Sequence, residues 1–406
     1  RVNNRDQKLE VQLFRASFPV FRHAAIAKFI KTNTETQCST VLHTYLFCMN
    51  IRFEKSNQNF LSILRKQVNS YFEENQISTY GNNELFLKSV ILFGLLAVNY
   101  FLQVFVITAG TWEWFACYFF QGIVFALIGF NVMHDGSHHS YSSNKQVNQM
   151  MAYSLNFLGG ISQFWHQKHV INHHTYTNIE GVDDDIDLKP FLRMHSDQLY
   201  IPIHKFQAYY AFFLYSLTYV FWIYYRDFKK YFTRKIADDT PMEELTLKDH
   251  FVFWITKIVH VFIFIGIPAF FMGPKLAILG YLILCLSCGF TLAIIFQLAH
   301  IVEGTIFSSK DENDTVLIGS EWSIHQINTT VNFGTESKVL TWLLGGLNFQ
   351  MVHHLFPKIS HVHYPALHKI ICETCDEYNV KYVEYKNFWS AVGSHLRYLN
   401  QMGKAV

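Results

Sequence analysis

Residues 112–139 read WEWFACYFFQGIVFALIGFNVMHDGSHH, an apolar run that ends directly in a histidine cluster. The part from 112 to 133 has roughly 20 residues, the length of a helix that crosses the hydrocarbon core of a bilayer. Histidines three to five positions apart share one helix face, so His134, His138 and His139 can point toward one centre. This stretch predicts a membrane-spanning helix that delivers imidazoles to one side of the membrane.

Two further histidine clusters also lie near apolar segments. KHVINHHTYTN (168–178) holds three histidines, NFQMVHHLFP (348–357) holds a pair, and His300 ends another apolar run. Three such clusters indicate a metal centre. Imidazole suits Zn, Cu, Fe and Ni, but eight or more histidines exceed the four ligands of one tetrahedral zinc. Two adjacent metal ions, most economically two irons that react with dioxygen, are therefore predicted.

The composition supports a membrane protein. Of 406 residues, 50% are hydrophobic and 17% aromatic, which is too apolar and aromatic for an ordinary soluble domain. The net charge of +2 gives no reason to expect a nucleic-acid partner. Seven scattered cysteines are expected to be reduced thiols. Cys372 and Cys375 form a CxxC, but no second pair accompanies it, so no zinc site is expected there.

The number of membrane crossings follows from parity. Five apolar segments are candidates, and 206–225 is aromatic-rich and runs into charged residues. If all the histidines serve one centre, His134 and His300 emerge on the same side, so an even number of crossings separates them. Segment 206–225 is therefore predicted to be an interfacial helix. Four spans remain, at about 85–107, 112–133, 251–272 and 276–299.

The predicted fold class is an all-α integral membrane protein with four transmembrane helices and a histidine-rich cap that holds a di-metal centre. Nearly all basic residues lie on the histidine side, so the positive-inside rule places the cap in the cytoplasm. Residues 1–50 are interpreted as an N-terminal extension of unknown role. Residues 51–84 are expected to form a cytoplasmic pre-membrane segment and 85–400 the membrane domain.

Several blocks carry a family resemblance. They are HDGSHH (134–139), KHVINHHTYTNIEGVDDDID (168–187), FQLAHIVEGT (296–305), EWSIHQINTTVNF (321–333) and GGLNFQMVHHLFPKISHVHYP (345–365). From about residue 51 to about 400 the chain resembles the histidine-box membrane fatty-acid desaturases, in particular bacterial linoleoyl-CoA-type acyl-CoA desaturases related to front-end desaturases. The resemblance implies a di-iron site, O2 as co-substrate, two external electrons and a cis double bond introduced into an acyl chain.

The resemblance also implies roles for individual residues. The expected metal ligands are His134, His138, His139, His169, His173, His174, His300, Gln350, His353 and His354. Residues expected to pack against or hydrogen-bond these ligands are Asp135, Trp165, Asp184, Asp185, Asp187, His325 and Asn348. The aspartate run 183–187 is by default a solvated loop, but one of its carboxylates is placed to accept a ligand histidine's N–H. His361, His363 and His368 are expected on the surface or facing the headgroups.

The expected partners are the lipid bilayer, an acyl-CoA or acyl-lipid substrate and an external electron donor. The sequence has neither an HPGG haem pattern nor a GxGxxG fingerprint after a strand. The reductant is therefore expected from outside, and the resemblance implies cytochrome b5 or a ferredoxin with its reductase as the donor. Lys229, Lys230, Arg234 and Lys235 are expected to meet anionic headgroups or, as an alternative, to dock the donor.

Two other functions remain open at the level of sequence. The same iron centre could insert oxygen and act as a fatty-acid or alkane hydroxylase. The histidines could instead bind zinc in a membrane protein without redox chemistry.

Overall fold

The computed structural model describes residues 50–54, 59–238, 240–311 and 315–404. Residues 1–49, and with them almost all of the expected N-terminal extension, lie outside the described residues. The chain divides into two units, Arg1–Ile51 and Arg52–Val406. The description that follows concerns the second unit.

Four helices in the described part of the chain are long and apolar enough to span a membrane. They are Asn83–Val106, Trp112–Ser137, Leu247–Met272 and Pro274–His300. The prediction of a helical fold with four spans is confirmed. The first three combine α-helical and wider π-helical turns. Their parts are α5 (Asn83–Phe101) with Leu102–Val106; α6 (Trp112–Ile128) with Gly129–Met133 and α7 (His134–Ser137); and α13 (Leu247–Val261) with Phe262–Gly266 and α14 (Ile267–Met272).

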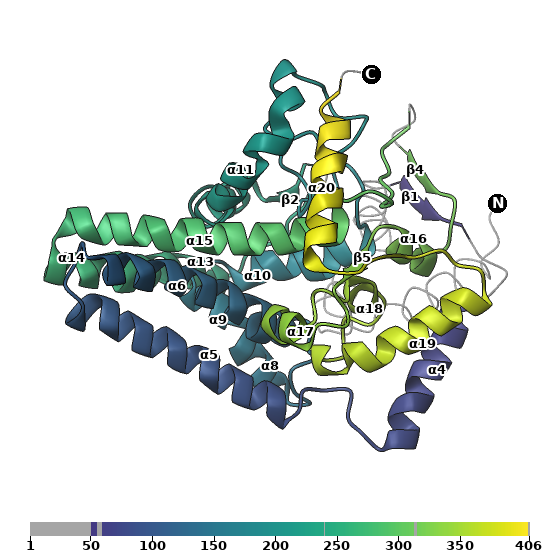
Figure 1. Ribbon diagram of the computed structural model, residues 1–406, viewed down its shortest axis with the longest axis horizontal. Coiled ribbons are helices and arrows are strands. Elements are labelled where there is room, and N and C mark those ends of the chain that lie inside the picture. The colour runs from purple at the N-terminus through teal and green to yellow at the C-terminus, as the bar shows by residue number, and fades with distance from the viewer. Residues whose placement is uncertain (1–49, 55–58, 239, 312–314, 405–406) are drawn as a thin grey trace, which may run out of the picture. The chain divides into compact units, whose positions relative to one another are not determined.

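The last span, α15 (Pro274–His300), packs against α6 and α14, and α5 packs against α6 on the side away from α15 (Figure 1). Small residues permit these close approaches. A Cβ at Gly122 of α6 would lie 2.2 Å from the carbonyl oxygen of Leu284, and one at Gly280 would lie 2.6 Å from the Tyr118 ring. Membrane helices associate through such tight packing because lipid is as apolar as their side chains.

The aromatic segment expected in the interface forms α11 (Gln207–Phe221), which continues as π-helical Trp222–Arg226. It packs against α15, where a Cβ at Gly289 would lie 2.4 Å from the Ser216 carbonyl oxygen. The opposite face exposes Tyr209 and Phe213, which are 83% and 66% accessible. One packed face and one exposed aromatic face suit a helix at a membrane boundary; its interfacial position stays a prediction.

The remaining elements surround the histidine-bearing ends of the spans. A separate apolar cluster includes Phe60, Leu64, Leu367 and Ile371, and it joins α4 to α19. The helices are α4 (Phe60–Asn75), α8 (Lys145–Ala152), α9 (Ser154–Phe157), α10 (Ser162–Trp165), α12 (Asp227–Thr233), α16 (Trp322–Asn328), α17 (Lys338–Leu344), α18 (Gln350–Leu355), α19 (Tyr364–Glu377) and α20 (Phe388–Met402). The strands are β1 (Asn50–Phe53), β2 (Lys235–Ala237), β3 (Thr240–Pro241), β4 (Thr315–Ile318), β5 (Val331–Phe333) and β6 (Val383–Tyr385), arranged in two-stranded pairs.

A buried ion pair ties α13 to the segment after α11. Lys257 Nζ lies 2.7 Å from Asp227 Oδ2 and donates to the carbonyl oxygens of Gly159 and Ile223 at 2.7 and 2.8 Å. All three donors of the ammonium group therefore have acceptors. The two side chains are 8% and 1% exposed.

Replacing Asp227 with alanine is expected to destabilise the protein by about 3–5 kcal/mol, because it leaves a buried ammonium without its counter-charge. Thermal unfolding of the purified protein in detergent measures this loss. The matched control is Glu303→Ala, which removes the exposed pair with Arg397 and should cost at most about 1 kcal/mol. Equal losses of stability in the two variants would contradict the role of Asp227 as the buried counter-charge of Lys257.

Candidate metal centre

The histidines predicted to meet form two adjoining groups. The donor nitrogens of His134, His138, His169 and His353 all lie within 4.8 Å of one another, and all four side chains are buried. Those of His173, His300 and His354 form a second, equally compact group. These residues come from α7 and the residue after it (the first histidine box, 134–139), from the second box (168–178), from α15 and from α18 (the third box, 348–357). Segments far apart in sequence therefore supply each group.

His174 lies between the two groups. Its ring centroid is 4.5 Å from that of His353 and 4.4 Å from that of His354. Gln350 completes the second group, with its amide nitrogen 3.0 Å from His300 Nε2 and 3.5 Å from His354 Nε2. The two groups thus share a boundary, as a pair of neighbouring metal ions requires.

The second box delivers three imidazoles because it is not an ordinary α-helix. His166–His173 is π-helical and follows directly on α10. The wider turn of a π-helix brings positions four and five apart toward the same side. The rings of His169 and His173 consequently stack at 5.0 Å, and His174 lies 5.0 Å from His169. A π-helical turn, Gly129–Met133, likewise precedes His134 in the first box.

The donor chemistry fits metal ions. Within the described residues, the Nε2 atoms of His134, His138, His169, His173 and His353 are buried without a hydrogen-bond partner, and so are both ring nitrogens of His174. Buried polar atoms in proteins are nearly always satisfied, so a convergent set of unpartnered nitrogens indicates an absent ligand. Neutral imidazole nitrogens are common metal ligands.

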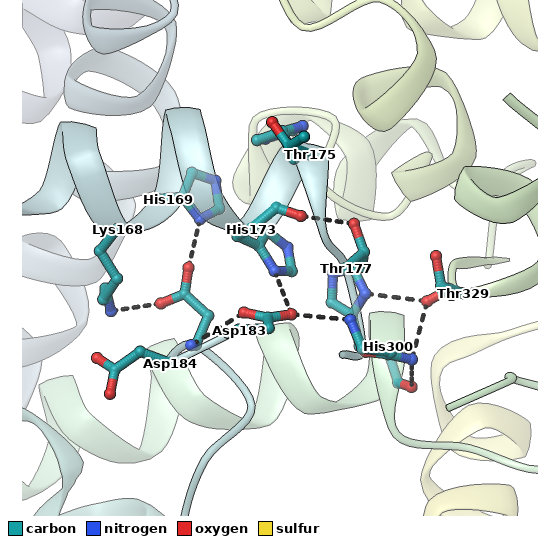
Figure 2. Close-up of polar contacts among 12 residues, drawn as sticks. Lys168, His169, His173, Thr175, Thr177, Asp183, Asp184, His300 and Thr329 are labelled. Carbon is teal, nitrogen blue, oxygen red and sulfur yellow. Dashed lines mark hydrogen bonds and ion pairs between the residues drawn. The ribbon is translucent and has the colours of Figure 1, made fainter. Parts of the chain in front are cut away.

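The other ring nitrogen of most of these histidines is held by a protein group. His169 Nδ1 bonds Asp185 at 2.8 Å and His173 Nδ1 bonds Asp183 at 2.9 Å, as Figure 2 shows for His173. Such partners fix the tautomer and the ring orientation so that Nε2 faces the metal. The remaining contacts are His300 Nδ1 to the Thr329 carbonyl oxygen at 3.1 Å, His353 Nδ1 to the Tyr364 hydroxyl at 3.0 Å and His354 Nδ1 to Gln326 Oε1 at 2.8 Å.

The Asp185 carboxylate is ionised. Burial alone would raise the pKa of Asp185, but Lys168 and His169 outweigh it and hold that pKa well below its usual value. Burial lowers the pKa of His169 to about 4, which keeps the ring neutral for a metal. At His173 burial acts in the same direction, but Asp183 prevails and raises the pKa. Protonation of His173 therefore competes with metal binding.

The expected supporting residues have different surroundings. Trp165 stacks on the His169 ring at 4.3 Å, and Asp185 holds His169. Asp184 instead pairs with Lys230 and Arg226, and Asp187 with Lys189. The His325 ring contacts the Thr177 carbonyl oxygen at 2.9 Å, and Asn348 donates to Thr341. Lys230 is thus buried in an ion pair and cannot face headgroups or a docked donor.

Two histidines lie elsewhere than expected. His139 is exposed, has a φ of 59° and belongs to neither group, because the helix ends at Ser137 and the chain turns away. His361 was expected on the surface, which is wrong. It is 3% exposed, with Nδ1 3.0 Å from Asp135 Oδ2 and Nε2 3.1 Å from Lys88 Nζ.

Sequence reasoning missed several residues that orient ligands. Asp183 belongs to the acidic run already singled out, but sequence spacing alone did not distinguish it from its neighbours. The EWSIHQ block drew attention to His325 as a residue that supports the ligands. The bond to a ligand histidine is made instead by the next residue, Gln326. Tyr364 and Thr329 also lie within blocks of the resemblance, but no feature of the sequence singled them out from their neighbours.

A cavity of about 350 Å³ reaches the first group of histidines. Its apolar walls include Phe125, Leu158, Tyr219, Cys288 and Ala293, and His134 and His169 lie on its boundary. Lys168, Lys189, Arg226, Asp184 and Asp187 line a polar part. The cavity therefore combines a narrow apolar space with a charged region and borders the candidate metal centre.

Four membrane-length helices and two adjoining groups of buried histidines define a multi-pass membrane protein with a two-metal site. A sequence profile described as fatty acid desaturase matches residues 109–386, more than half of the chain. The chain therefore belongs to the fatty acid desaturase family and is a membrane desaturase, an O2-dependent oxidoreductase.

Individual relatives agree with this assignment. The chain is 34% identical over 355 residues to the sn-1 linoleoyl-lipid 6-desaturase of Synechocystis sp., covering 86% of this chain and 96% of the relative. It is 31% identical over 356 residues to the acyl-lipid (8-3)-desaturase of Physcomitrium patens, covering 86% and 73%. An sn-1 linoleoyl-lipid 6-desaturase of Arthrospira platensis is 31% identical over 344 residues, covering 84% and 92%.

Proposed function

We propose that the protein desaturates the acyl chains of membrane lipids with two iron ions held by the paired histidine groups. When bound, the iron pair would supply the oxidation, in which O2 takes two electrons from the donor and two hydrogens with their electrons from the acyl chain, and with two protons from solvent becomes two molecules of water. The proposed ligands are His134, His138, His169, His173, His174, His300, His353 and His354, with Gln350 facing the second ion. The exposed His139 is omitted.

The two adjoining groups of convergent imidazole nitrogens, most of which have no hydrogen-bond partner, are the observation that carries this proposal. They support two ions, where a single structural zinc would use four ligands and leave no open position. The family to which the chain belongs supports iron. An acyl-lipid substrate is supported by the names of the relatives from Synechocystis sp. and Physcomitrium patens.

The protein's own residues position the acyl chain and the ligands. The apolar cavity holds the acyl chain beside the first histidine group and excludes water from it. Asp183, Asp185 and Gln326 hold three of the rings in fixed orientations. The charged residues that line the cavity suit the polar end of a lipid.

The proposal further includes a cytoplasmic active site, a membrane domain from 85 to 400 preceded by the segment 51–84, and an external donor such as cytochrome b5 or a ferredoxin with its reductase. The excess of basic residues on the histidine side supports this orientation.

The test is expression of the full chain in a host that supplies both donors, followed by gas chromatography and mass spectrometry of fatty acids from separated lipid and acyl-CoA fractions. A new unsaturated species that appears first in the lipid fraction is expected, and it should be absent with a His353→Ala/His354→Ala control. A hydroxylated product would instead indicate the hydroxylase. Stoichiometric zinc without activity after iron loading would indicate the non-redox protein.

Filling the cavity is expected to reduce the activity without removing the metal. Replacing Ala293 on α15 with phenylalanine places a ring in the apolar wall and should lower the desaturation rate by at least about tenfold, a barrier increase of about 1.4 kcal/mol. Product formation and iron content measure the two effects separately. Leu282→Phe on the same helix is the control, because Leu282 is 43% exposed and lies outside the cavity. Unchanged activity in Ala293→Phe would exclude this cavity as the acyl site.

A further inference from the structure

One polar side chain on the wall of the cavity has no partner in the protein. Gln297 lies on α15, one turn before His300, and it lines the cavity beside the apolar residues Leu292, Ala293 and Phe296. It is 3% exposed, and its Oε1 is buried without a hydrogen-bond partner. Buried polar groups are nearly always hydrogen-bonded, and an unpaired one costs stability. An amide in this state indicates a polar group of a ligand that binds in the cavity.

The NH2 group is the end of this amide that can bind such a group. Gln297 Nε2 donates to no described residue, and unlike Oε1 it is not fully buried. An NH2 group has two N–H donors and requires an acceptor. The other glutamine on the cavity wall differs, because Gln350 Nε2 already faces His300 and His354 at 3.0 and 3.5 Å. Of these two glutamines, only Gln297 keeps a free donor.

We propose, on the basis of the function inferred above, that Gln297 donates a hydrogen bond to the ester carbonyl of the bound acyl chain and thereby fixes which carbons lie at the metal centre. The carbonyl is the polar group that every acyl chain carries, and its oxygen only accepts hydrogen bonds. The apolar walls contact each methylene group alike, so by themselves they let the chain slide. A carbonyl held at Gln297 sets the number of carbons between the anchor and the reacting bond.

The charged part of the cavity brings the polar end of a substrate close to the histidines. Asp185 accepts from His169 Nδ1 at 2.8 Å and also pairs with Lys168. All three residues line the cavity. A headgroup that meets this charged part therefore leaves only a short length of acyl chain between the ester and the first histidine group.

Gln297 itself is carried by a turn of α15 that adjoins the second histidine group. The ring of Phe296, the residue directly before it, lies 5.2 Å from the ring of His173 and 4.9 Å from that of His300. A carbonyl bound to Gln297 consequently lies within a few carbons of the metal centre.

Methyl oleate and oleyl methyl ether test the anchor with the purified full chain. The two probes have the same chain and no headgroup, but the ether has CH2 in place of the carbonyl. Binding is measured as the rise in the midpoint of thermal unfolding, without an electron donor, so the result does not depend on turnover. The unmodified protein should bind the ester about fivefold or more tightly than the ether, the expected effect of one hydrogen bond. Equal shifts, as expected if the amide holds only a water, would overturn the proposal whether or not the chain desaturates lipids.

Variants assign the preference to Gln297. Gln297→Leu should bind the two probes equally, and without a probe it should unfold at a higher temperature than the unmodified protein, because an unpaired buried amide has been removed. Thr291→Val is the matched control on the same helix, since the Thr291 hydroxyl donates to the Ser287 carbonyl oxygen at 2.8 Å and does not line the cavity. It should keep the preference for the ester.

The position of the double bond gives a second measurement. Mass spectrometry of the products should show one position for the unmodified protein and several for Gln297→Leu, with the iron content unchanged. Retention of the ester preference or of a single double-bond position in Gln297→Leu would overturn the proposal, and so would loss of the ester preference in Thr291→Val. If Gln297→Leu elutes as aggregate in size-exclusion chromatography, Gln297→Met takes its place with the same expected results.

Discussion

Replacing His354 with alanine is expected to abolish desaturation while the protein still folds. His354 is fully buried, its Nδ1 bonds Gln326, and its Nε2 faces the second histidine group. Loss of the ring removes a proposed ligand outright, so the effect should exceed the roughly 10–100-fold cost of losing a group that only orients a ligand. Activity and the iron-to-protein ratio measure the effect, and one iron per chain should remain.

The control for this experiment is His139→Ala. His139 is a box histidine by sequence but is exposed and outside both groups. Its replacement should leave activity within about threefold of the unmodified protein, as expected for a surface change that costs at most about 0.5 kcal/mol. An active His354→Ala variant, or equal losses in both variants, would contradict the proposed ligand set.

Replacing Asp183 with asparagine is expected to lower iron affinity and activity by about 10–100-fold. Asp183 Oδ2 accepts from His173 Nδ1 and from the Asn178 backbone amide, both at 2.9 Å, and Oδ1 accepts from the Asp185 amide at 3.1 Å. Asparagine has one oxygen, so one of these donors would face an NH2 group. It also lacks the charge that stabilises a positively charged metal site.

Iron retention during dialysis against a weak chelator measures the affinity. Asp187→Asn is the matched control, because Asp187 lies in the same acidic run but pairs with Lys189 and contacts no ligand histidine. It should retain iron like the unmodified protein even if its place on the cavity wall changes substrate binding. Equal iron loss in the two variants would mean that Asp183 does not orient His173.

The four spans could be predicted from sequence because their signal is local. A helix in lipid must satisfy its own backbone and expose apolar side chains, so about 20 apolar residues suffice to identify it. The segment Trp112–Ser137, with histidines at its end, is found where the pattern predicted it. The metal centre could also be predicted from the sequence, because no packing role calls for so many histidines next to membrane-length segments.

The residues that hydrogen-bond the ligand histidines were harder to predict from the sequence. Asp183 and Asp185 were within the predicted run, but which carboxylate meets which ring depends on the π-helical path of His166–His173. His361 was expected on the surface or facing the headgroups. It is buried instead, in contact with Asp135 and Lys88, which lie far away in sequence.

By itself, the sequence determined the number of spans, the helical fold and the histidines that carry the chemistry, because apolar length and residue type are properties of short segments. Only the tertiary structure decided which nitrogens converge, that His139 is excluded and where the cavity lies. The convergence and the cavity depend on contacts between segments more than a hundred residues apart, and their geometry is set by the packing of all the helices at once.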